Sequence, residues 1–353
     1  MPKKEEQLSG VKEIARRANV SIGTVDRVLH NRNGVSPKTR EKVKAIIKEL
    51  DYQPNLLARR LASKKVIHIA TLLPLVSKDT SFWLVPLEGI NRAEAEIKQY
   101  NIRIDRYFFD QDDKESFVSQ TRKILRKKPD GILLSPDFID ESVVFTNKCN
   151  QLGIPYVFID SDIETQNRLS YIGPHLYDSG YLVANLVSYI LRGNESVLLL
   201  NISKRMHKYH HLLRKEEGFR SYFKDHSINR KIEKIDIRKG DSRSIEKELE
   251  AVLSVNDDIR LVFVTNSRVS IVSRCLKKFK RKLILIGFDF IEENIKALIE
   301  GDIDFLICQK PGEQAYKGVM ALYQFIVLNA RVDKIQFMPI DVITRENYQF
   351  YKN

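Results

Sequence analysis

The sequence predicts a small all-α head with a helix-turn-helix, joined by a short helix to an α/β body of two doubly wound parallel-sheet lobes. Three observations predict this architecture. Apolar residues recur at helical spacing in three short segments near the N-terminus. Positive charge is concentrated in the same region. Beyond residue 65, short aliphatic runs alternate with amphipathic helices in two series, which is typical of parallel sheets covered by helices.

The domain boundaries follow from these patterns. We assign residues 1–53 to the helix-turn-helix domain, 54–65 to a short helix and linker, and 66–353 to the two-lobed body. The first three helices are expected to share one core, because each has a single apolar face. Ser21 and Ser36 are predicted to cap the second and third helices. The predicted inner residues are Val11, Ile14, Ala15, Ala18, Val25, Val28, Leu29, Val43, Ile46, Ile47 and Leu50.

The charge of the head predicts its partner. Residues 1–65 hold 16 Lys and Arg against 7 Asp and Glu, a net charge of +9 out of +13 for the whole chain. Phosphate binding requires such a concentration of cations. The second helix of a helix-turn-helix lies in the major groove and leads with its N-terminal residues. The alternative, a small helical bundle used for protein contact, is disfavoured by the charge.

The bulk properties exclude several classes of protein. No apolar run reaches the roughly 18 residues that span a bilayer, and MPKKEEQLSG lacks the apolar core of a signal peptide. We therefore expect a cytoplasmic protein without a membrane partner. Cys149, Cys275 and Cys308 are far apart and lack a CxxC partner, which indicates buried free thiols rather than a metal site or a nucleophile.

The body is expected to contain two successive α/β series. In the first, the predicted strands are 66–73, 102–109, 131–135 and 156–160, and the predicted helices are 84–100, 116–126 and 141–151. The second series starts near Tyr171. Its predicted helices are 179–192, 214–224, 244–253 and 269–279, and its strands are 197–201, 234–237, 261–265 and 283–287. Helix 312–328 and strand 340–344 are expected to cross back and tie the lobes together.

Polar residues stand repeatedly where predicted strands end, and parallel sheets bind ligands at that edge. They are Ser135 with Asp137, Asp160 with Asp162, Asn266, Asp289 and Gln309. An aromatic pair, Phe82-Trp83, precedes the first helix of the body. Carboxylates, amides and an aromatic platform suit a polyhydroxylated ligand such as a sugar. For Asp137 and Asp162, helix capping or a turn is an equal alternative.

The residues of the head resemble a known family. The segments ANVS, TVxRVL, VSPKTREKV, YQPN and ARRLAS are similar to the lactose-repressor/galactose-repressor (LacI/GalR) family of bacterial transcription regulators. The body resembles, more loosely, the type I periplasmic-binding-protein fold that this family carries. Its cues are PDGILLSP, IPYVFIDSD, GPHLYDSGYLVANL, RKEEGFRSYF, FVTN, IGFDF and QKPGEQAYKG. Together the two regions cover nearly the entire chain.

The resemblance implies a role for each part. The short helix 55–62 would be a hinge helix that inserts into the minor groove, with Leu61 wedged between base pairs; a plain basic linker is the alternative. The expected DNA-binding residues are Ser21, Ile22, Gly23, Thr24, Arg27, His30, Ser36, Thr39, Asn55, Arg59 and Leu61. The expected effector-binding residues are Phe82, Trp83, Ser135, Asp160, Lys215, Asn266, Asp289 and Gln309.

Three positions depart from the family pattern. Asp26 stands near the DNA phosphates, where a carboxylate is repelled unless Arg27 or Arg32 pairs with it or a cytosine amine donates to it. Gly10 stands where a capping Thr is common, and Ser9 is a substitute. Lys215 replaces an arginine and loses a bidentate donor, although the neighbouring Arg214 is an alternative.

The sequence thus predicts a DNA-binding transcription regulator, a repressor, that acts as a homodimer on a pseudo-palindromic operator. A small carbohydrate-like effector bound between the lobes would control it. The alternative is a sugar-binding or sugar-modifying protein with a fused DNA-binding head. Neither GxxxxGK[ST] nor GxGxxG occurs, so we expect no enzyme and no cofactor. His207, His210 and His211 invite a metal site, but a polar loop at the cleft edge is favoured over it.

Overall fold

The computed structural model describes residues 10–29, 31–52, 65–77, 80–203, 210–279 and 281–353. The predicted hinge helix and His30 lie outside these residues. Contacts between Cα atoms divide the chain into two compact units, Met1–Lys64 and Lys65–Asn353. The first unit carries the head and the second carries both α/β lobes. Within the described residues, no helix combines the length and apolarity that crossing a bilayer requires.

The head contains the three predicted helices, α1 (Val11–Ala18), α2 (Ile22–Leu29) and α3 (Pro37–Glu49). Their inner faces meet in one cluster of seven buried residues, Ile14, Ala15, Ala18, Val25, Val28, Val43 and Ile46. Both predicted caps are confirmed: Ser21 Oγ accepts from Thr24 N at 3.1 Å, and Ser36 Oγ accepts from Thr39 N at 3.2 Å. Gly10 precedes α1 in the left-handed region, with φ of 73°, and offers no side-chain cap.

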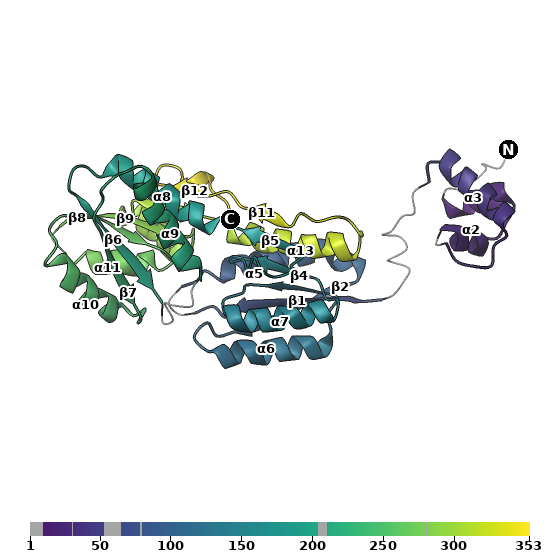
Figure 1. Ribbon diagram of the computed structural model, residues 1–353, viewed down its shortest axis with the longest axis horizontal. Helices are drawn as coiled ribbons and strands as arrows, with labels where there is room; N and C mark the ends of the chain where they lie inside the picture. The colour runs from purple at the N-terminus through teal and green to yellow at the C-terminus, as the bar shows by residue number, and fades with distance from the viewer. Residues whose placement is uncertain (1–9, 30, 53–64, 78–79, 204–209, 280) are drawn as a thin grey trace, which may run out of the picture. The chain divides into compact units, whose positions relative to one another are not determined.

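The first lobe is a parallel six-stranded sheet in the order β11-β5-β4-β3-β1-β2. Figure 1 shows α6 and α7 on one face of this sheet and α5 and α13 on the other. The strands are β1 (Ile67–Pro74), β2 (Ile102–Phe109), β3 (Gly131–Leu134), β4 (Tyr156–Ile159), β5 (Ser170–Gly173) and β11 (Ile335–Phe337). The helices are α5 (Leu84–Ile97), α6 (Lys114–Lys127), α7 (Ile139–Gln151) and α13 (Pro311–Ile326), with the 3₁₀ turn η1 (Lys98–Tyr100) after α5.

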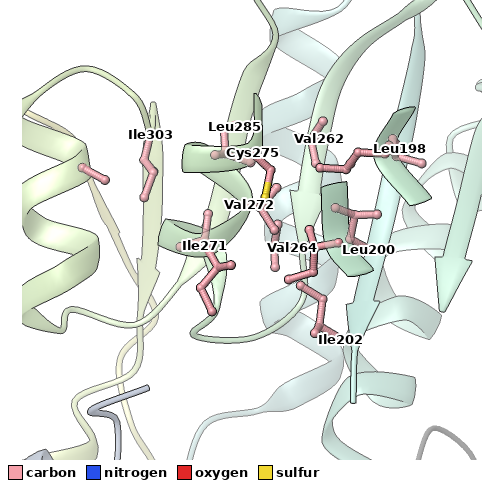
Figure 2. Packing of buried hydrophobic residues seen from close by; sticks show 14 of the residues in the cluster. Leu198, Leu200, Ile202, Val262, Val264, Ile271, Val272, Cys275, Leu285 and Ile303 are labelled. Carbon is pink, nitrogen blue, oxygen red and sulfur yellow. The ribbon is translucent and has the colours of Figure 1, made fainter. Parts of the chain in front are cut away.

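The second lobe repeats the plan, with sheet order β12-β10-β9-β8-β6-β7. Its strands are β6 (Ser196–Ile202), β7 (Ile232–Ile237), β8 (Ile259–Val264), β9 (Ile284–Phe288), β10 (Phe305–Cys308) and β12 (Asp341–Ile343). Its helices are α8 (Leu176–Ile190), α9 (His210–Asp225), α10 (Ser242–Leu253), α11 (Val269–Leu276) and α12 (Glu292–Ile299), followed near the C-terminus by η3 (Tyr348–Phe350). Figure 2 shows how side chains of β6 and β8 pack against those of α11.

The structure corrects the predicted body in three places. Tyr171 does not open the second series, because β5 pairs with β4 in the first sheet. The second sheet is not wholly parallel, because β12 runs antiparallel to β10. Helix α12 and strand β11 were not expected, since a two-turn helix and a three-residue edge strand leave little periodicity to detect.

Three connections cross between the lobes. They run from β5 to α8, from β10 to α13 and from β11 to β12. Helix α13 packs on strands of the first sheet, whereas β12 joins the second. The prediction that the last helix and strand tie the lobes together is therefore confirmed. The predicted burial of Cys149, Cys275 and Cys308 as free thiols is confirmed too.

Candidate functional site

A cavity of about 250 Å³ lies between the lobes, at the carboxyl ends of their strands. Its walls carry acidic, basic, amide and aromatic side chains from both sheets. Seven of the eight residues expected to bind an effector line it: Phe82, Trp83, Asp160, Lys215, Asn266, Asp289 and Gln309. Four of these residues, Asp160, Asn266, Asp289 and Gln309, were also expected because each stands where a predicted strand ends, and parallel strands bring their carboxyl ends to one edge.

Ser135 is the exception. Its side chain is buried behind the cavity wall, and its Oγ donates to Asp137 Oδ1 at 3.1 Å. The other oxygen of Asp137 accepts from Gln111 Nε2 at 2.6 Å, and Gln111 does line the cavity. Ser135 and Asp137 thus support a wall residue rather than form the wall. Asp162 also turns away, into an ion pair of 2.6 Å with Arg168.

Several lining residues were missed by the sequence reasoning. The polar ones are Ser77, Thr80, Asp110, Gln111, Asp112, Ser203, Ser267 and Arg268, whereas His211 was expected at the cleft edge. The missed residues lie one to six residues beyond the ends of β1, β2, β6 and β8. The strand-end rule was not applied to the first three of these strands, and it took only Asn266 after the fourth.

Lys215 of α9, rather than Arg214, faces the cavity. Its side chain is 4% exposed, its Nζ donates to the Thr265 carbonyl at 3.3 Å, and it lies 3.7 Å from the centroid of the Phe288 ring. Arg214 pairs instead with Glu217 at 2.6 Å. The alternative left open by the sequence is therefore resolved in favour of Lys215.

Two glycines bring α9 close enough to deliver Lys215. A Cβ added to Gly180 of α8 would lie 1.8 Å from the Lys215 carbonyl oxygen. A Cβ added to Gly218 of α9 would lie 1.9 Å from the Tyr177 carbonyl oxygen. Because neither distance tolerates a side chain, the contact between α8 and α9 requires both glycines. Gly180 is the second glycine of the segment GPHLYDSGYLVANL, and Gly218 is the glycine of RKEEGFRSYF.

Burial sets the electrostatics of the cavity. Burial, together with the negative charge of Asp137, raises the pKa of Asp160 to about 7 against the attraction of Lys215. It raises the pKa of Asp289 to about 6, again against the attraction of Lys215. Burial also lowers the pKa of Lys215, although Asp289 and Asp160 counter it. Lys215, Asp160 and Asp289 are thus the buried ionisable groups of the cavity, and burial makes the charged form of each less favourable.

Both carboxyl groups follow a strand in the left-handed backbone region, with φ of 68° at Asp160 and 77° at Asp289. Aspartate tolerates this conformation better than most residues. Asp289 is anchored there by a hydrogen bond from its N–H to the Ile307 carbonyl at 3.0 Å. Phe82 and Trp83 meet edge to face, with ring centroids 5.0 Å apart. Acceptors, an ammonium and aromatic edges can together bind an uncharged ligand with many hydroxyl groups.

The head presents a second candidate surface on α2. Ile22, Gly23 and Arg27 are exposed there, as is Ser21 at the helix start, and Thr24 is half-buried. Asp26 pairs with Arg32 at 3.1 Å, which is one of the two pairings that the sequence analysis proposed to reduce repulsion from phosphate. Of the other expected DNA-binding residues, Ser36 is exposed and Thr39 is half-buried at the start of α3. His30, Asn55, Arg59 and Leu61 lie outside the described residues.

The histidine cluster is only partly described. His211 lines the cavity, whereas His207 and the side chain of His210 lie outside the described residues. Among the residues that are described, no group of three or more His, Cys, Asp or Glu is placed to hold a metal ion.

Comparison with known families bears on both units. Residues 69–329, most of the chain, match the periplasmic binding protein domain. Residues 10–55 match the bacterial regulatory proteins of the lacI family. The chain belongs to the family of the periplasmic binding protein domain, and its head carries the lacI-family match. The resemblance and the fold predicted from the sequence are thereby confirmed.

Individual relatives agree with this assignment. The chain is 31% identical to catabolite control protein A of Staphylococcus epidermidis over 150 residues, 42% of the chain and 43% of the relative. It is 24% identical over 351 residues to the NTD biosynthesis operon regulator NtdR of Bacillus subtilis, covering 96% and 99%. The chain spans about two fifths of the length of the catabolite control proteins that it matches.

A solved structure is similar over the body. It is described as a LacI transcriptional regulator from Bacteroides fragilis, with a TM-score of 0.75 and 28% identity. The similarity covers 82% of this chain and all of that one. The two-lobed body of the chain is thus an arrangement already seen in a protein of that description.

Proposed function

We propose that this protein is a transcriptional repressor that binds operator DNA through its head and is controlled by a small carbohydrate-like effector bound between its lobes. One observation carries the proposal: a chain with a basic helix-turn-helix also has an interlobe cavity lined by carboxylates, amides and an aromatic pair. An interlobe cavity of this kind couples binding to lobe position, because a ligand that touches both lobes favours their closure.

In this proposal the head reads DNA as half of a homodimer, because one head contacts too few bases for useful specificity. Ile22, Gly23 and Arg27, exposed on α2, would meet base edges in the major groove. Ser21, Thr24, Ser36 and Thr39 stand at helix starts, where backbone N–H groups suit phosphate. His30, outside the described residues, would contact DNA as well. Asn55, Arg59 and Leu61 would reach the minor groove, with Leu61 as the wedge.

Arg27 is the residue to test in the head. Arg27→Ala should lower affinity for the operator far more than affinity for random DNA, because a base contact contributes roughly 1–3 kcal/mol of discrimination. Lys44→Ala, at an exposed position of α3, is the matched loss of one positive charge. Fluorescence anisotropy on both DNAs measures the effect. Equal losses on the two DNAs would make Arg27 a phosphate contact only.

The cavity residues divide the work of holding a sugar. Asp160 from one lobe, and Asp289, Asn266 and Gln309 from the other, would accept from or donate to hydroxyl groups. Lys215 would donate from the floor, and the Phe82–Trp83 pair would cover an apolar face of the ring. Such a site bridges the lobes because its members come from both sheets.

The chain contains its own reporter for this test. Trp83 is the only tryptophan and lies in the cavity wall, so an occupant should change its fluorescence. A panel of neutral sugars and polyols is titrated and also screened by thermal shift, since a ligand of the folded state raises the melting midpoint. Asp289→Ala should weaken a hit by about 2 kcal/mol. Asp257→Ala, at a fully exposed carboxylate, is the control. Unchanged affinity in Asp289→Ala would refute the assignment of the cavity.

A further inference from the structure

The lobes are held together by side-chain contacts as well as by the three crossing connections. Ser81, just before α5 of the first lobe, donates twice to Glu293 of α12 in the second lobe. Its N–H reaches Oε1 at 2.9 Å and its Oγ reaches Oε2 at 2.8 Å. Beside this pair, Thr80 Oγ1 lies 3.0 Å from Ser267 Oγ. We call these four residues the interlobe clasp.

The clasp has rigid support in the second lobe. Glu293 is half-buried in the first turn of α12, where the helix dipole favours a negative charge. The next residue, Asn294, is fully buried, and its Nδ2 lies within 3.0 Å of the carbonyl oxygens of Ser267, Phe288 and Asp289. The first turn of α12 therefore positions Glu293 and Ser267, the two clasp residues of the second lobe, together with the backbone of Asp289.

The clasp also reaches the aromatic wall of the cavity. Thr80 Oγ1 accepts from the N–H of Phe82 at 3.2 Å, and Thr80 and Ser267 are themselves lining residues. A continuous path of hydrogen bonds thus runs from Phe82 through Thr80 to Ser267, and from Ser267 through Asn294 to Asp289. This path connects the backbone of Phe82 with the backbone of Asp289, and both residues line the cavity.

We propose that the interlobe clasp stabilises the closed arrangement of the lobes and positions Phe82 and Trp83 opposite Asp289. Ser81 and Glu293 are positioning residues in this account. Opening the lobes would break both hydrogen bonds that the Glu293 carboxylate accepts across the interface. Removing the carboxylate should therefore shift the balance toward the open form. The consequence for an effector rests on the proposed function, because only a cavity that takes a ligand gains or loses apparent affinity with closure.

The test measures lobe closure directly in the protein without any added ligand. Spin labels are attached at Val144→Cys of the first lobe and Val255→Cys of the second, both exposed, while the native cysteines are buried. Pulsed dipolar spectroscopy on full-length chain diluted into unlabelled protein reports the distance within one chain. Glu293→Ala is compared with Glu292→Ala, which removes the same charge from an exposed position on the same turn.

We expect Glu293→Ala to lower the closed-to-open ratio by roughly tenfold or more, because a hydrogen bond to a charged group is among the stronger kinds. Glu292→Ala should leave the distance distribution unchanged. Ser81→Ala keeps the N–H donor, so its shift should lie between the two. Identical distributions in all four proteins, or a wild type that is wholly open, would overturn the proposal.

Two further readouts separate positioning from loss of structure and from failure of the proposed function. Glu293→Gln keeps one acceptor oxygen and should recover part of the closed population, and Ser81→Ala serves if Glu293→Ala does not fold. If no sugar or polyol perturbs Trp83, the proposed effector class fails while the ligand-free distances still decide the clasp. Conversely, a hit whose affinity does not follow the closed population across the variants would contradict the positioning role.

Discussion

The two buried carboxyl groups make the ligand-free cavity costly to maintain. The unfolded chain titrates its aspartates near 3.8, whereas burial raises the pKa of Asp289 to about 6 and that of Asp160 to about 7. The folded chain therefore binds protons more readily than the unfolded chain between about pH 4 and pH 7. The stability that these groups contribute is greatest at low pH and falls as the pH rises through their folded pKa values.

This sign predicts an unusual variant. Asp289→Asn should have a higher free energy of unfolding than wild type, because the variant loses a group whose ionisation opposes folding. This advantage should be larger at pH 8 than at pH 5 by roughly 1–1.5 kcal/mol. Urea unfolding followed by Trp83 fluorescence at the two pH values measures the difference. Asp257→Asn, at a fully exposed carboxylate, is the matched control. An Asp289→Asn variant that tracks wild type at both values would contradict the assigned burial effect.

At the residue scale, the two buried carboxyl groups could be predicted from the sequence, but the residues that hold them in place could not. Asp160 and Asp289 were found because each follows a strand, which is a local signal. Glu293 carried no such signal, because its partner Ser81 lies 212 positions away in the chain. Ser135 does not line the cavity for a related reason: a residue that ends a strand can point behind the cavity wall, and its contact with Asp137 reveals this.

At the scale of elements, the contact between α8 and α9 decides where Lys215 lies. Gly180→Ala should force the two helices apart, because the added Cβ would otherwise lie 1.8 Å from the Lys215 carbonyl oxygen. Overpacking of this kind costs about 1–3 kcal/mol. We expect a lower free energy of unfolding together with weaker binding of any sugar that the cavity accepts. Urea unfolding and Trp83 titration measure the two effects.

The control for this variant is Tyr189→Ala, which truncates an exposed side chain of the same helix. It should change neither quantity by more than about 0.5 kcal/mol. A Gly180→Ala protein as stable as wild type, with unchanged binding, would show that the helices can part without moving Lys215.

Most elements of the body could be predicted because their burial patterns are simple. All four residues of β3 and of β4 are buried, as expected of inner strands in a parallel sheet. Strand β11 has two exposed apolar residues, Ile335 and Phe337, and only three positions, so no period emerges. The assignment of Tyr171 to the wrong lobe has a different cause: sheet membership is set by strand pairing, and no pattern within β5 specifies it.

At the scale of the whole molecule, the head and the body are separate compact units, so control of DNA binding requires coupling between them. In the proposed homodimer, two heads must meet two half-sites at a fixed spacing. Closure of the lobes around an effector would change the relative position of the two linkers, and with it the spacing of the heads. The free energy available is the difference between the effector's contacts in the closed and open states.

Coupling of this kind has to be reciprocal, and this gives a quantitative prediction. If a sugar identified by the Trp83 screen changes operator affinity by a given factor, the operator must change the affinity for that sugar by the same factor. We expect a factor of roughly 5–150, equivalent to about 1–3 kcal/mol. Operator titrations at zero and saturating sugar give one value, and calorimetric sugar titrations with and without operator give the other. In Asp289→Ala both factors should fall toward one over the concentration range that saturates wild type, while operator affinity without sugar stays near the wild-type value. Coupling that persists in that variant at those concentrations would mean that the sugar acts from a site other than the interlobe cavity.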